Sequence, residues 1–299
     1  MVSKRTVLVV GAGGSMPYDY PSGQKLVYDI ASQLGRPTAL GNLMRDLEFT
    51  NDAQLAFART LRRSHAGSID AFLELNDEFL AIGKAAIAAS LAPLEEEEAL
   101  LRKPDWYHYL AQKIISNLKN GTAEQLTVVT FNYDRSLDYS LKLALENHFP
   151  ASTAAKFSAL LKIIHVHGSL CPLPGDANSS EPYRSYGDSS VERIQQSAKS
   201  IKIIHEHNDD SPELGLARAE LMAAERVCFL GFGFHPTNVR RLLIGGWVSR
   251  LNFPLYGSAF DMTNAERSIL AEPFNGKLHF TDRTWGCLTF LREHAYYLR

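Results

Sequence analysis

Four short segments combine an apolar run with a small or polar end, and they constrain the fold more than any other feature of the chain. They are VLVVGAGGSMPY at 7–18, TFNYD at 130–134, HVHGS at 165–169 and CFLGFGF at 228–234. Apolar runs of this length are typical of strands buried in a parallel sheet. In an open α/β sheet, ligands bind beyond the carboxyl ends of such strands. We therefore expect the small and polar residues of these segments to meet at one edge of a sheet.

Strand-like and helix-like patterns alternate over most of the chain, which predicts an α/β fold with a doubly wound, Rossmann-like parallel sheet. Strands are expected at 6–10, 126–130, 162–166, 201–205, 226–230, 254–260 and 277–280. Helices are expected at 23–34, 135–147, 212–224, 237–249, 264–270 and 285–297. No internal repeat and no long linker interrupts the pattern, so residues 1–299 are expected to form a single domain.

Two stretches depart from the alternation. Residues 38–120 carry almost no strand signal, and their apolar residues recur at helical spacing, so we expect a helical insertion within the domain. Ser68 is a good N-cap for the helix that follows it. Residues 171–200 are rich in Pro, Gly, Ser and Asp, which predicts a long exposed loop.

Bulk properties exclude several classes of function. The 299 residues carry a net charge of -2, so no global field attracts nucleic acid or an anionic membrane, and we expect no direct nucleic-acid partner. The most apolar helix candidate, 79–94, contains Lys84 and is too short to span a membrane. There are three cysteines and no CxxC pair, so we expect no zinc module, no bound metal and free thiols in the cytoplasm, without a signal peptide.

Two glycine-rich turns are candidate phosphate sites. Gly11-Ala12-Gly13-Gly14-Ser15 and Gly231-Phe232-Gly233-Phe234 each follow a strand candidate. Small residues let main-chain N–H groups approach a phosphate at such a turn. Met16 breaks the GxGxxG spacing of the first turn, and no GK[ST] is present there. A tight turn without a ligand therefore stays open for each, although two such turns in one chain favour a dinucleotide.

Polar residues follow two other strand candidates. If the strand continues, Phe131 and Tyr133 face one way while Asn132 and Asp134 face the other. Asn132 can hold a water molecule or a sugar hydroxyl. Asp134 can contact a ligand, but it can equally cap the helix that follows.

Two histidines lie two positions apart, at 165 and 167, on the same side of a regular strand. Three roles are open: a metal site, a hydrogen-bonded structural histidine, and a general base at His167 that opens onto a pocket. The polar cluster of His205, His207 and Asp209–Asp210 is expected at a loop entrance, without assigned chemistry.

The motifs GAGGSMPYDYPSG, SIDAFL at 68–73, TFNYD, HGS and GFGF resemble, in this order, those of the sirtuin superfamily. They are most similar to its bacterial branch linked to antiviral defence, whose members hydrolyse NAD. The resemblance implies that Asn132 and His167 are catalytic. It also implies a set of residues that bind NAD as the substrate: Gly11, Ala12, Gly13, Ser15, Tyr18, Thr130, Asp134, Gly231, Phe232 and Gly233.

The resemblance implies hydrolysis of NAD to ADP-ribose and nicotinamide, as the NAD-depleting effector of an antiviral, abortive-infection system. Two alternatives stay open: an NAD-dependent protein deacylase, and a module that binds NAD or ADP-ribose without cleaving it. The chain lacks the two CxxC pairs of deacylases, and PYDYPSG replaces their Phe-Arg-containing loop, which favours simple NAD cleavage. An NAD hydrolase that is always active would kill its own cell, so its activity must be restrained. The resemblance implies that an activating partner releases it, such as a HerA-like ATPase or an Argonaute-type protein.

The helical stretch 38–120 holds more large apolar side chains than one sheet face can cover. Exposed apolar surface of this kind usually marks an interface, so we expect a homo-oligomer built through these helices. The alternative is that the insertion packs entirely on its own core. The residues concerned are Phe57, Leu61, Ile69, Phe72, Phe79, Ile82, Ile87 and Leu91.

Overall fold

The computed structural model describes residues 4–102, 104–120, 126–176, 182–203, 211–243 and 246–294. Its centre is a parallel sheet of six strands in the order β3-β2-β1-β4-β5-β6. The strands are β1 (Thr6–Val10), β2 (Leu126–Thr130), β3 (Lys162–His165), β4 (Arg226–Leu230), β5 (Leu255–Gly257) and β6 (Leu278–Phe280). The predicted fold class, an α/β doubly wound parallel sheet, is confirmed.

The strand order reverses at β1. The chain runs from β1 outward to β2 and β3, then returns to pair β4 with the other edge of β1. Val10, the last residue of β1, lies opposite Thr130 on β2 and Leu230 on β4. The carboxyl ends of the three central strands therefore lie level, which is where open α/β sheets bind ligands.

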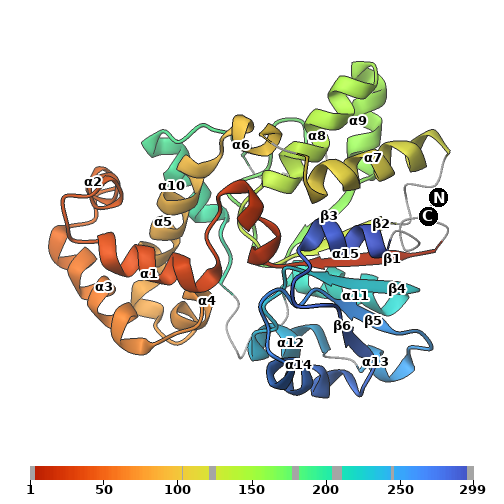
Figure 1. Ribbon diagram of the computed structural model, residues 1–299. Helices are drawn as coiled ribbons and strands as arrows, with labels where there is room; N and C mark the ends of the chain where they lie inside the picture. The colour runs from red at the N-terminus through yellow and green to blue at the C-terminus, as the bar shows by residue number, and fades with distance from the viewer. Residues whose placement is uncertain are drawn as a thin grey trace.

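Helices cover both faces of the sheet (Figure 1). Alternate residues of the strands face opposite cores: Leu8 and Val10 join one apolar cluster, and Val7 and Val9 join the other. The first face is covered by α7 (Trp106–Lys119), α8 (Ser136–His148) and α15 (Cys287–Glu293). The second is covered by α11 (Pro212–Ala223), α12 (Pro236–Leu243) and α13 (Trp247–Arg250).

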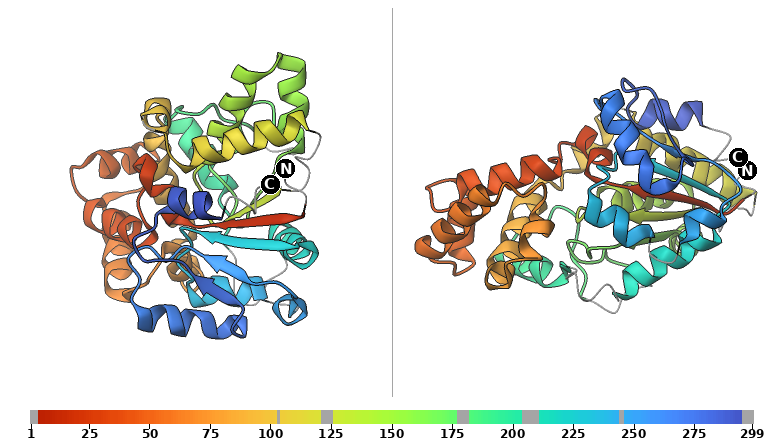
Figure 2. Two further views of the ribbon diagram at one scale, coloured as in Figure 1. Left: turned by 45° about the vertical axis from the view of Figure 1, so that its right-hand side comes forward. Right: turned by 90° about the horizontal axis from the view of Figure 1, so that it is seen from below.

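A group of helices extends from the carboxyl end of the sheet (Figures 1 and 2). It consists of α1 (Gly23–Gln33), α2 (Ala39–Asp46), α3 (Asn51–Ser64), α4 (Ile69–Leu73), α5 (Leu80–Leu91) and α10 (Val191–Ser200). The short helix α6 (Glu97–Leu101) leads from this group back to α7. The described part of residues 38–120 contains helices and turns only, as its apolar spacing predicts.

The apolar residues on which the oligomer argument depends are covered within one chain. Seven of the eight are buried, and Phe79 packs partly buried against the same cluster. Phe57, Phe72 and Phe79 form a group of aromatic rings with centroids 5.5–5.9 Å apart. The premise of a surplus apolar surface is therefore wrong, because these side chains fill the core between α3, α4 and α5.

The prediction of a long exposed loop at 171–200 is confirmed only in part, because the described residues of 171–190 form no helix or strand, whereas the remainder of the stretch is helical. Cys171 is buried, Arg184 is buried, and Val191–Ser200 forms α10, which packs on α5. Ile194 and Ser197 lie three residues apart on the covered face of that helix, so a small hydroxyl replaces the apolar residue that the expected periodicity requires. Residues 177–181 lie outside the described part of the chain.

Other differences concern single elements. Ile201–Ile203 is not a strand, and the rest of that predicted strand, with the cluster at 205–210, lies outside the described residues. The predicted helix 237–249 forms two helices, α12 and α13, and Gly246 with φ +63° is the N-cap of α13. Two further helices complete the fold, the unpredicted α9 (Ala151–Leu160) and the predicted α14 (Asn264–Ala271).

Candidate functional site

The two glycine-rich turns pack directly on each other at the point where the strand order reverses. The N–H of Gly11 donates to the oxygen of Leu230 at 3.1 Å, and the N–H of Gly13 donates to the oxygen of Gly231 at 2.9 Å. Gly231 has φ +55°, and a Cβ on it would lie 2.1 Å from the nitrogen of Gly14. Glycine is therefore required here by the contact between the turns.

Four of the five N–H groups of the first turn are already engaged. Besides Gly11 and Gly13, Gly14 donates to the oxygen of Gly11 at 2.8 Å and Ser15 to the oxygen of Ala12 at 3.0 Å. The glycines of this turn can therefore be explained by the packing of the two turns, without a bound phosphate. This was the alternative left open by the sequence. Gly233 differs, because a Cβ on it would meet open space. Ligand binding by Gly11, Gly13, Gly231, Phe232 and Gly233 stays a prediction.

A cavity lies beside these turns, beyond the carboxyl ends of β1 and β2. It is small, with about 80 Å³ of space for water-sized molecules, which is less than most small-molecule sites enclose. The sheet contributes the last residues of the two strand–turn segments, and α1 and α4 contribute the opposite wall. The lining residues are Ala12, Ser15, Tyr20, Pro21, Gly23, Leu26, Ser68, Ile69, Asp70, Leu91, Phe131, Asn132, Tyr133 and Asp134.

Asn132 is fixed at the floor of this cavity. Its Nδ2 donates to the oxygen of Gly11 at 3.1 Å and to Oγ of Ser15 at 3.0 Å. Its main-chain N–H donates to Oγ1 of Thr130 at 3.1 Å. The side chain is 8% exposed, and its amide oxygen takes part in none of the hydrogen bonds among described residues. Thr130 therefore acts on the site through Asn132, and the Asn132 oxygen is available for a ligand.

The expected alternation along TFNYD does not occur. Phe131, Asn132, Tyr133 and Asp134 all line the cavity, because β2 ends at Thr130 and the chain leaves the strand geometry. Side chains alternate between the two faces of a sheet only as far as the strand extends.

Asp134 bonds the first residue of α8, as in the capping alternative, although the N-cap position itself is Arg135. Its Oδ1 accepts from the N–H of Ser136 at 3.1 Å and from the Ser136 hydroxyl, at the start of α8. Burial raises the pKa of this carboxyl. Because Asp134 also lines the cavity, contact with a ligand remains a prediction for its second oxygen.

His167 is 1% exposed and lies behind two aromatic residues of the cavity. Its ring centroid is 5.6 Å from that of Phe131 and 5.9 Å from that of Tyr133. Neither ring nitrogen makes a hydrogen bond of normal geometry to a described residue, although the side chain of Asn238 and the main chain of Lys202 lie near. Burial lowers the pKa of His167, so its imidazole is neutral at neutral pH and can accept a proton.

His165 has a different role from its neighbour. Its Nδ1 lies 2.9 Å from the oxygen of Asn132, and its Nε2 lies 3.1 Å from Oδ1 of Asp138. Burial alone would lower the pKa of His165, but the Asp138 carboxylate and the two hydrogen bonds outweigh it and raise that pKa. When protonated, His165 donates from both ring nitrogens, and through Nδ1 it holds the main chain of Asn132. This pairing makes His165 a positioning residue.

Tyr18 is buried behind the cavity and is not one of its lining residues. Its ring stacks on Tyr107 of α7 at 3.9 Å, and its hydroxyl accepts from the N–H of Tyr107 at 3.0 Å. The Tyr107 hydroxyl in turn lies 3.3 Å from Oγ of Ser15 and 2.7 Å from Oγ of Ser136. Tyr18 therefore supports the turn that carries Ser15, and its predicted contact with a nucleotide stays untested.

Sequence reasoning did not identify Asp70 as a site residue. Ser68 caps α4 as predicted, since its Oγ accepts from the N–H of Ala71 at 3.3 Å. This places Asp70 in the first turn of α4 and in the cavity wall, where it accepts a hydrogen bond from the Tyr133 hydroxyl. The available signal was the SIDAFL motif, which contains the only acidic residue of that segment.

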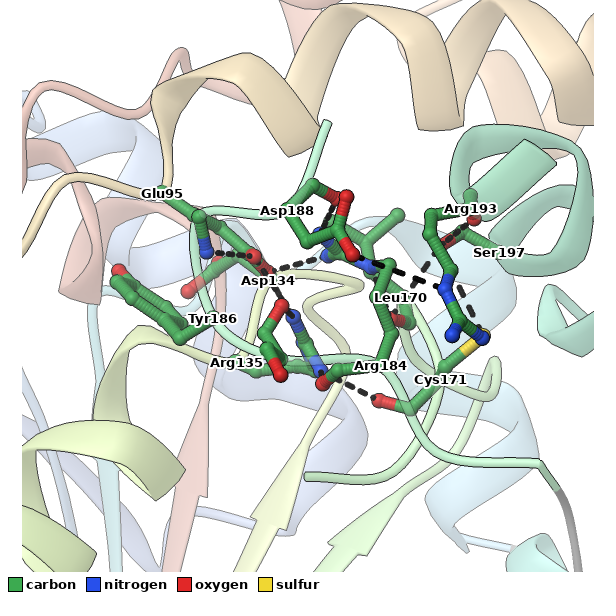
Figure 3. A network of polar contacts seen from close by, with 12 residues as sticks. Glu95, Asp134, Arg135, Leu170, Cys171, Arg184, Tyr186, Asp188, Arg193 and Ser197 are labelled. Atoms are coloured by element: carbon green, nitrogen blue, oxygen red, sulfur yellow. Dashed lines mark hydrogen bonds and ion pairs between the residues drawn. The ribbon is translucent and has the colours of Figure 1, made fainter. Parts of the chain in front are cut away.

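A buried ion network lies near Asp134 (Figure 3). Glu95 accepts from Nε and Nη2 of Arg135 at 2.9 and 2.6 Å, and its Oε1 lies 2.7 Å from Nη2 of Arg184. Arg135 also donates to the oxygens of Cys171 and Arg184, at 3.2 and 2.7 Å. These bonds fix residues 182–188, which sequence reasoning assigned to an exposed loop.

The same network reaches the cavity through two tyrosines. The hydroxyls of Tyr20 and Tyr186 lie 3.2 Å apart, and Tyr186 stacks on Tyr139 with centroids 4.1 Å apart. Because Tyr20 lines the cavity, the position of one wall depends on the fixed segment 182–188.

A second hollow lies at the amino ends of the strands, with about 610 Å³ of empty space. Arg5, Thr127, Lys162 and Glu220 are among its lining residues. Lys162 and Glu220 form an ion pair at 2.5 Å, and Thr127 donates to Glu220 at 3.0 Å. Its polar groups thus neutralise one another, far from the residues expected to bind a ligand.

Within the described ranges, no three His, Cys, Asp or Glu side chains are grouped so that they could hold a metal ion. The three cysteines are free and buried. No helix in the described part of the chain is long and apolar enough to cross a membrane.

No family model matches the chain, and no curated protein matches it. Among solved structures, the crystal structure of a Sir2 homolog–NAD complex is similar at 13% sequence identity, with a TM-score of 0.45. The alignment covers 100% of this chain and 92% of that one.

Proposed function

We propose that this protein hydrolyses NAD to ADP-ribose and nicotinamide. The observation that carries the proposal is the meeting of Asn132 and Ser15 at the floor of one cavity, with the buried, neutral His167 behind its aromatic wall. The order of the sirtuin-like motifs along the chain supports the same assignment. In this view the whole chain acts as a single sirtuin-like domain with a helical insertion at 38–120.

The chemistry requires a held ribose, a placed water molecule and a proton acceptor. The bond between nicotinamide and the ribose breaks, and its electron pair leaves with nicotinamide as a neutral base. Water attacks the anomeric carbon, which carries positive charge, and the proton of that water passes to the protein. Asn132 would fix the ribose or the water through its free amide oxygen. His167 would accept the proton directly or through a ribose hydroxyl.

Positioning supplies most of the expected rate enhancement. Asn132 is fixed by Gly11, Ser15 and Thr130, and its main chain is held by His165. A residue held by two partners on its side chain and two on its main chain loses little further entropy when substrate binds, which favours a preorganised site.

We further propose that the protein is the NAD-depleting effector of an antiviral system in the cytoplasm. Its restraint would then depend on assembly into a homo-oligomer or on an activating partner, such as a HerA-like ATPase or an Argonaute-type protein. The motif resemblance alone supports these statements, since the apolar residues invoked for an interface are covered within one chain.

The deciding experiment incubates the purified protein with NAD and follows nicotinamide and ADP-ribose by chromatography. Release without any acyl-lysine peptide supports the hydrolase. Release that requires such a peptide indicates a deacylase, and binding without release indicates a module that senses the nucleotide. The Asn132→Ala variant is the control for contaminating activity.

A further inference from the structure

A chain of buried hydroxyl groups leads from the floor of the cavity into the junction between α7 and α8. Nδ2 of Asn132 lies 3.0 Å from Oγ of Ser15, and that oxygen lies 3.3 Å from the Tyr107 hydroxyl. The Tyr107 hydroxyl lies 2.7 Å from Oγ of Ser136, which bonds Oδ1 of Asp134. All five residues are less than a tenth exposed, so these bonds form in a medium of low dielectric constant, which strengthens them.

Only one direction of donation satisfies these four contacts. The main-chain N–H of Ser136 donates to Oδ1 of Asp134 at 3.1 Å, so this oxygen is an acceptor and the Ser136 hydroxyl donates to it as well. A hydroxyl has a single proton to donate. Ser136 therefore accepts from Tyr107, and Tyr107 accepts from Ser15. Ser15 in turn accepts from the amide nitrogen of Asn132.

The pKa shifts of two members agree with this direction. Burial raises the pKa of Tyr107 well above its ordinary value of 10.0, so the hydroxyl keeps the proton that it donates. Burial also raises the pKa of Asp134, and hydrogen bonds from Ser136 and Ser15 oppose that shift. Both serine protons thus point toward the carboxyl end of the chain, and Ser15 has none to offer to Asn132. If the amide of Asn132 were turned over, its oxygen would face two acceptor oxygens, so the chain fixes the orientation of the amide.

Tyr107 is itself held firmly at the start of α7. Its ring stacks on Tyr18 with centroids 3.9 Å apart. The neighbouring Trp106 donates from Nε1 to the main-chain oxygen of Gly14 at 2.8 Å. The first turn of α7 therefore contacts the glycine-rich turn at two successive residues, Gly14 and Ser15.

We propose that Tyr107 is a positioning residue that fixes the amide of Asn132 through Ser15, with Ser136 as the next member of the same chain. The proposal rests on the proposed function for the reaction in which Asn132 takes part. Tyr107 and Ser136 lie outside every motif of the sirtuin resemblance, which therefore gives them no role. Neither residue lines the cavity, so both act on a reaction there only through the residues that do.

The test uses variants that each remove one hydroxyl, and it measures nicotinamide release with NAD as the substrate. Tyr107→Phe keeps the ring that stacks on Tyr18, and Ser136→Ala keeps the main-chain bond to Asp134. Each should lower kcat about tenfold while KM stays within about twofold, because a buried hydrogen bond is lost and no contact with the substrate is removed. The double variant should also lose about tenfold, since both changes break the same chain.

Tyr109→Phe is the matched control and should keep the wild-type kcat. Tyr109 lies on the same helix, and its hydroxyl has no part in the chain. A second readout does not depend on catalysis. The side-chain amide protons of Asn132, assigned by NMR from their absence in Asn132→Ala, should exchange with solvent about tenfold faster in Tyr107→Phe than in the wild type.

The outcomes separate this proposal from the hydrolase assignment. Nicotinamide release by the wild type with an unchanged kcat in Tyr107→Phe, or losses that multiply in the double variant, would overturn the positioning role alone. If the wild type releases no nicotinamide, the hydrolase assignment fails and the amide exchange decides. Faster exchange in Tyr107→Phe then supports the positioning role, and unchanged exchange overturns it. If Tyr107→Phe does not fold, Ser136→Ala decides by the same two readouts.

Discussion

Nδ2 of Asn132 donates a hydrogen bond to the main-chain oxygen of Gly11 at 3.1 Å, which ties the end of β2 to the end of β1. The same nitrogen reaches Ser15 in the following turn. Both amide hydrogens are therefore used to hold the side chain, and its oxygen is left for the cavity. A side chain of similar size that lacks an N–H donor, such as Asp, could not make these two hydrogen bonds.

Asn132→Ala should reduce nicotinamide release on the order of a hundredfold or more, as expected when an aligning group at a reaction centre is lost. The fold should persist, because the removed side chain is small and polar. Steady-state kinetics and a melting curve check both parts. Full activity in this variant would remove Asn132 from the reaction centre.

His167→Ala should produce a loss of similar size, on the order of a hundredfold, since it removes the expected proton acceptor. Burial lowers the pKa of His167 below its ordinary 6.5, so the neutral form persists into mildly acidic solution. The wild-type rate should fall only as the pH falls through that lowered pKa. A rate-against-pH profile tests this, and a basic limb in place of the acidic one would contradict the base assignment.

The His165–Asp138 pair should stabilise the fold within a defined pH window. The pKa of His165 is raised, so its contribution is present below 6.5 and is lost as the pH rises through the folded value. For Asp138, burial raises the pKa, but the His165 charge outweighs it and the net pKa is lowered. Its contribution is therefore lost only as the pH falls through a value below 3.8.

Melting temperatures of the wild type and Asp138→Asn measured across pH check this expectation. The difference should be largest between the two ordinary pKa values, 3.8 and 6.5, and should shrink as the pH rises above 6.5. A difference that grows above neutral pH would have the wrong sign.

Glu95→Gln should be severely destabilising, because it leaves Arg135 and Arg184 buried without a counter-charge. Breaking a buried pair on one side typically costs about 3–5 kcal/mol of unfolding free energy. Glu96→Gln is the matched control, since that residue is exposed and has no part in the network. Denaturant unfolding distinguishes them, and equal midpoints for the two variants would show that the network contributes little.

Gly231→Ala and Gly233→Ala should differ sharply in stability although the residues are only two apart. The first has φ +55° and would place a Cβ 2.1 Å from the nitrogen of Gly14, whereas the second meets open space. We expect the first variant to fold poorly and the second to melt like the wild type. A normal melting temperature for Gly231→Ala would mean that the two turns can separate without cost.

The centre of the sheet could be predicted from the sequence because its strands are buried, mostly apolar runs. TVLVV at 6–10 and LTVVT at 126–130 have the predicted bounds, and both are buried throughout. The small and polar residues that follow these strands were predicted to form the site, and several of them lie at the floor of the cavity. Periodicity and strand ends are local signals, so one sequence is enough to find them.

The outer walls could not be predicted, because they depend on contacts between distant segments. Arg184 and Glu95 look like surface residues until the fold brings them together. α10 buries Ser197 and Ser200 where a helical pattern calls for apolar side chains, so its signal is weak. Asp70 belongs to a helix, and a search restricted to the ends of strands does not include it.

The contact between Gly13 and Gly231 also determines when a site can exist during synthesis. One turn follows the first strand and the other follows the fourth, and segment 182–188, which Arg135 binds, comes between them. Chains fold largely from the amino terminus as they are made. A nascent chain therefore has β1 and its helical group well before it has the opposing turn. An amino-terminal fragment that stops before β4 therefore lacks the turn on which Gly11 and Gly13 pack.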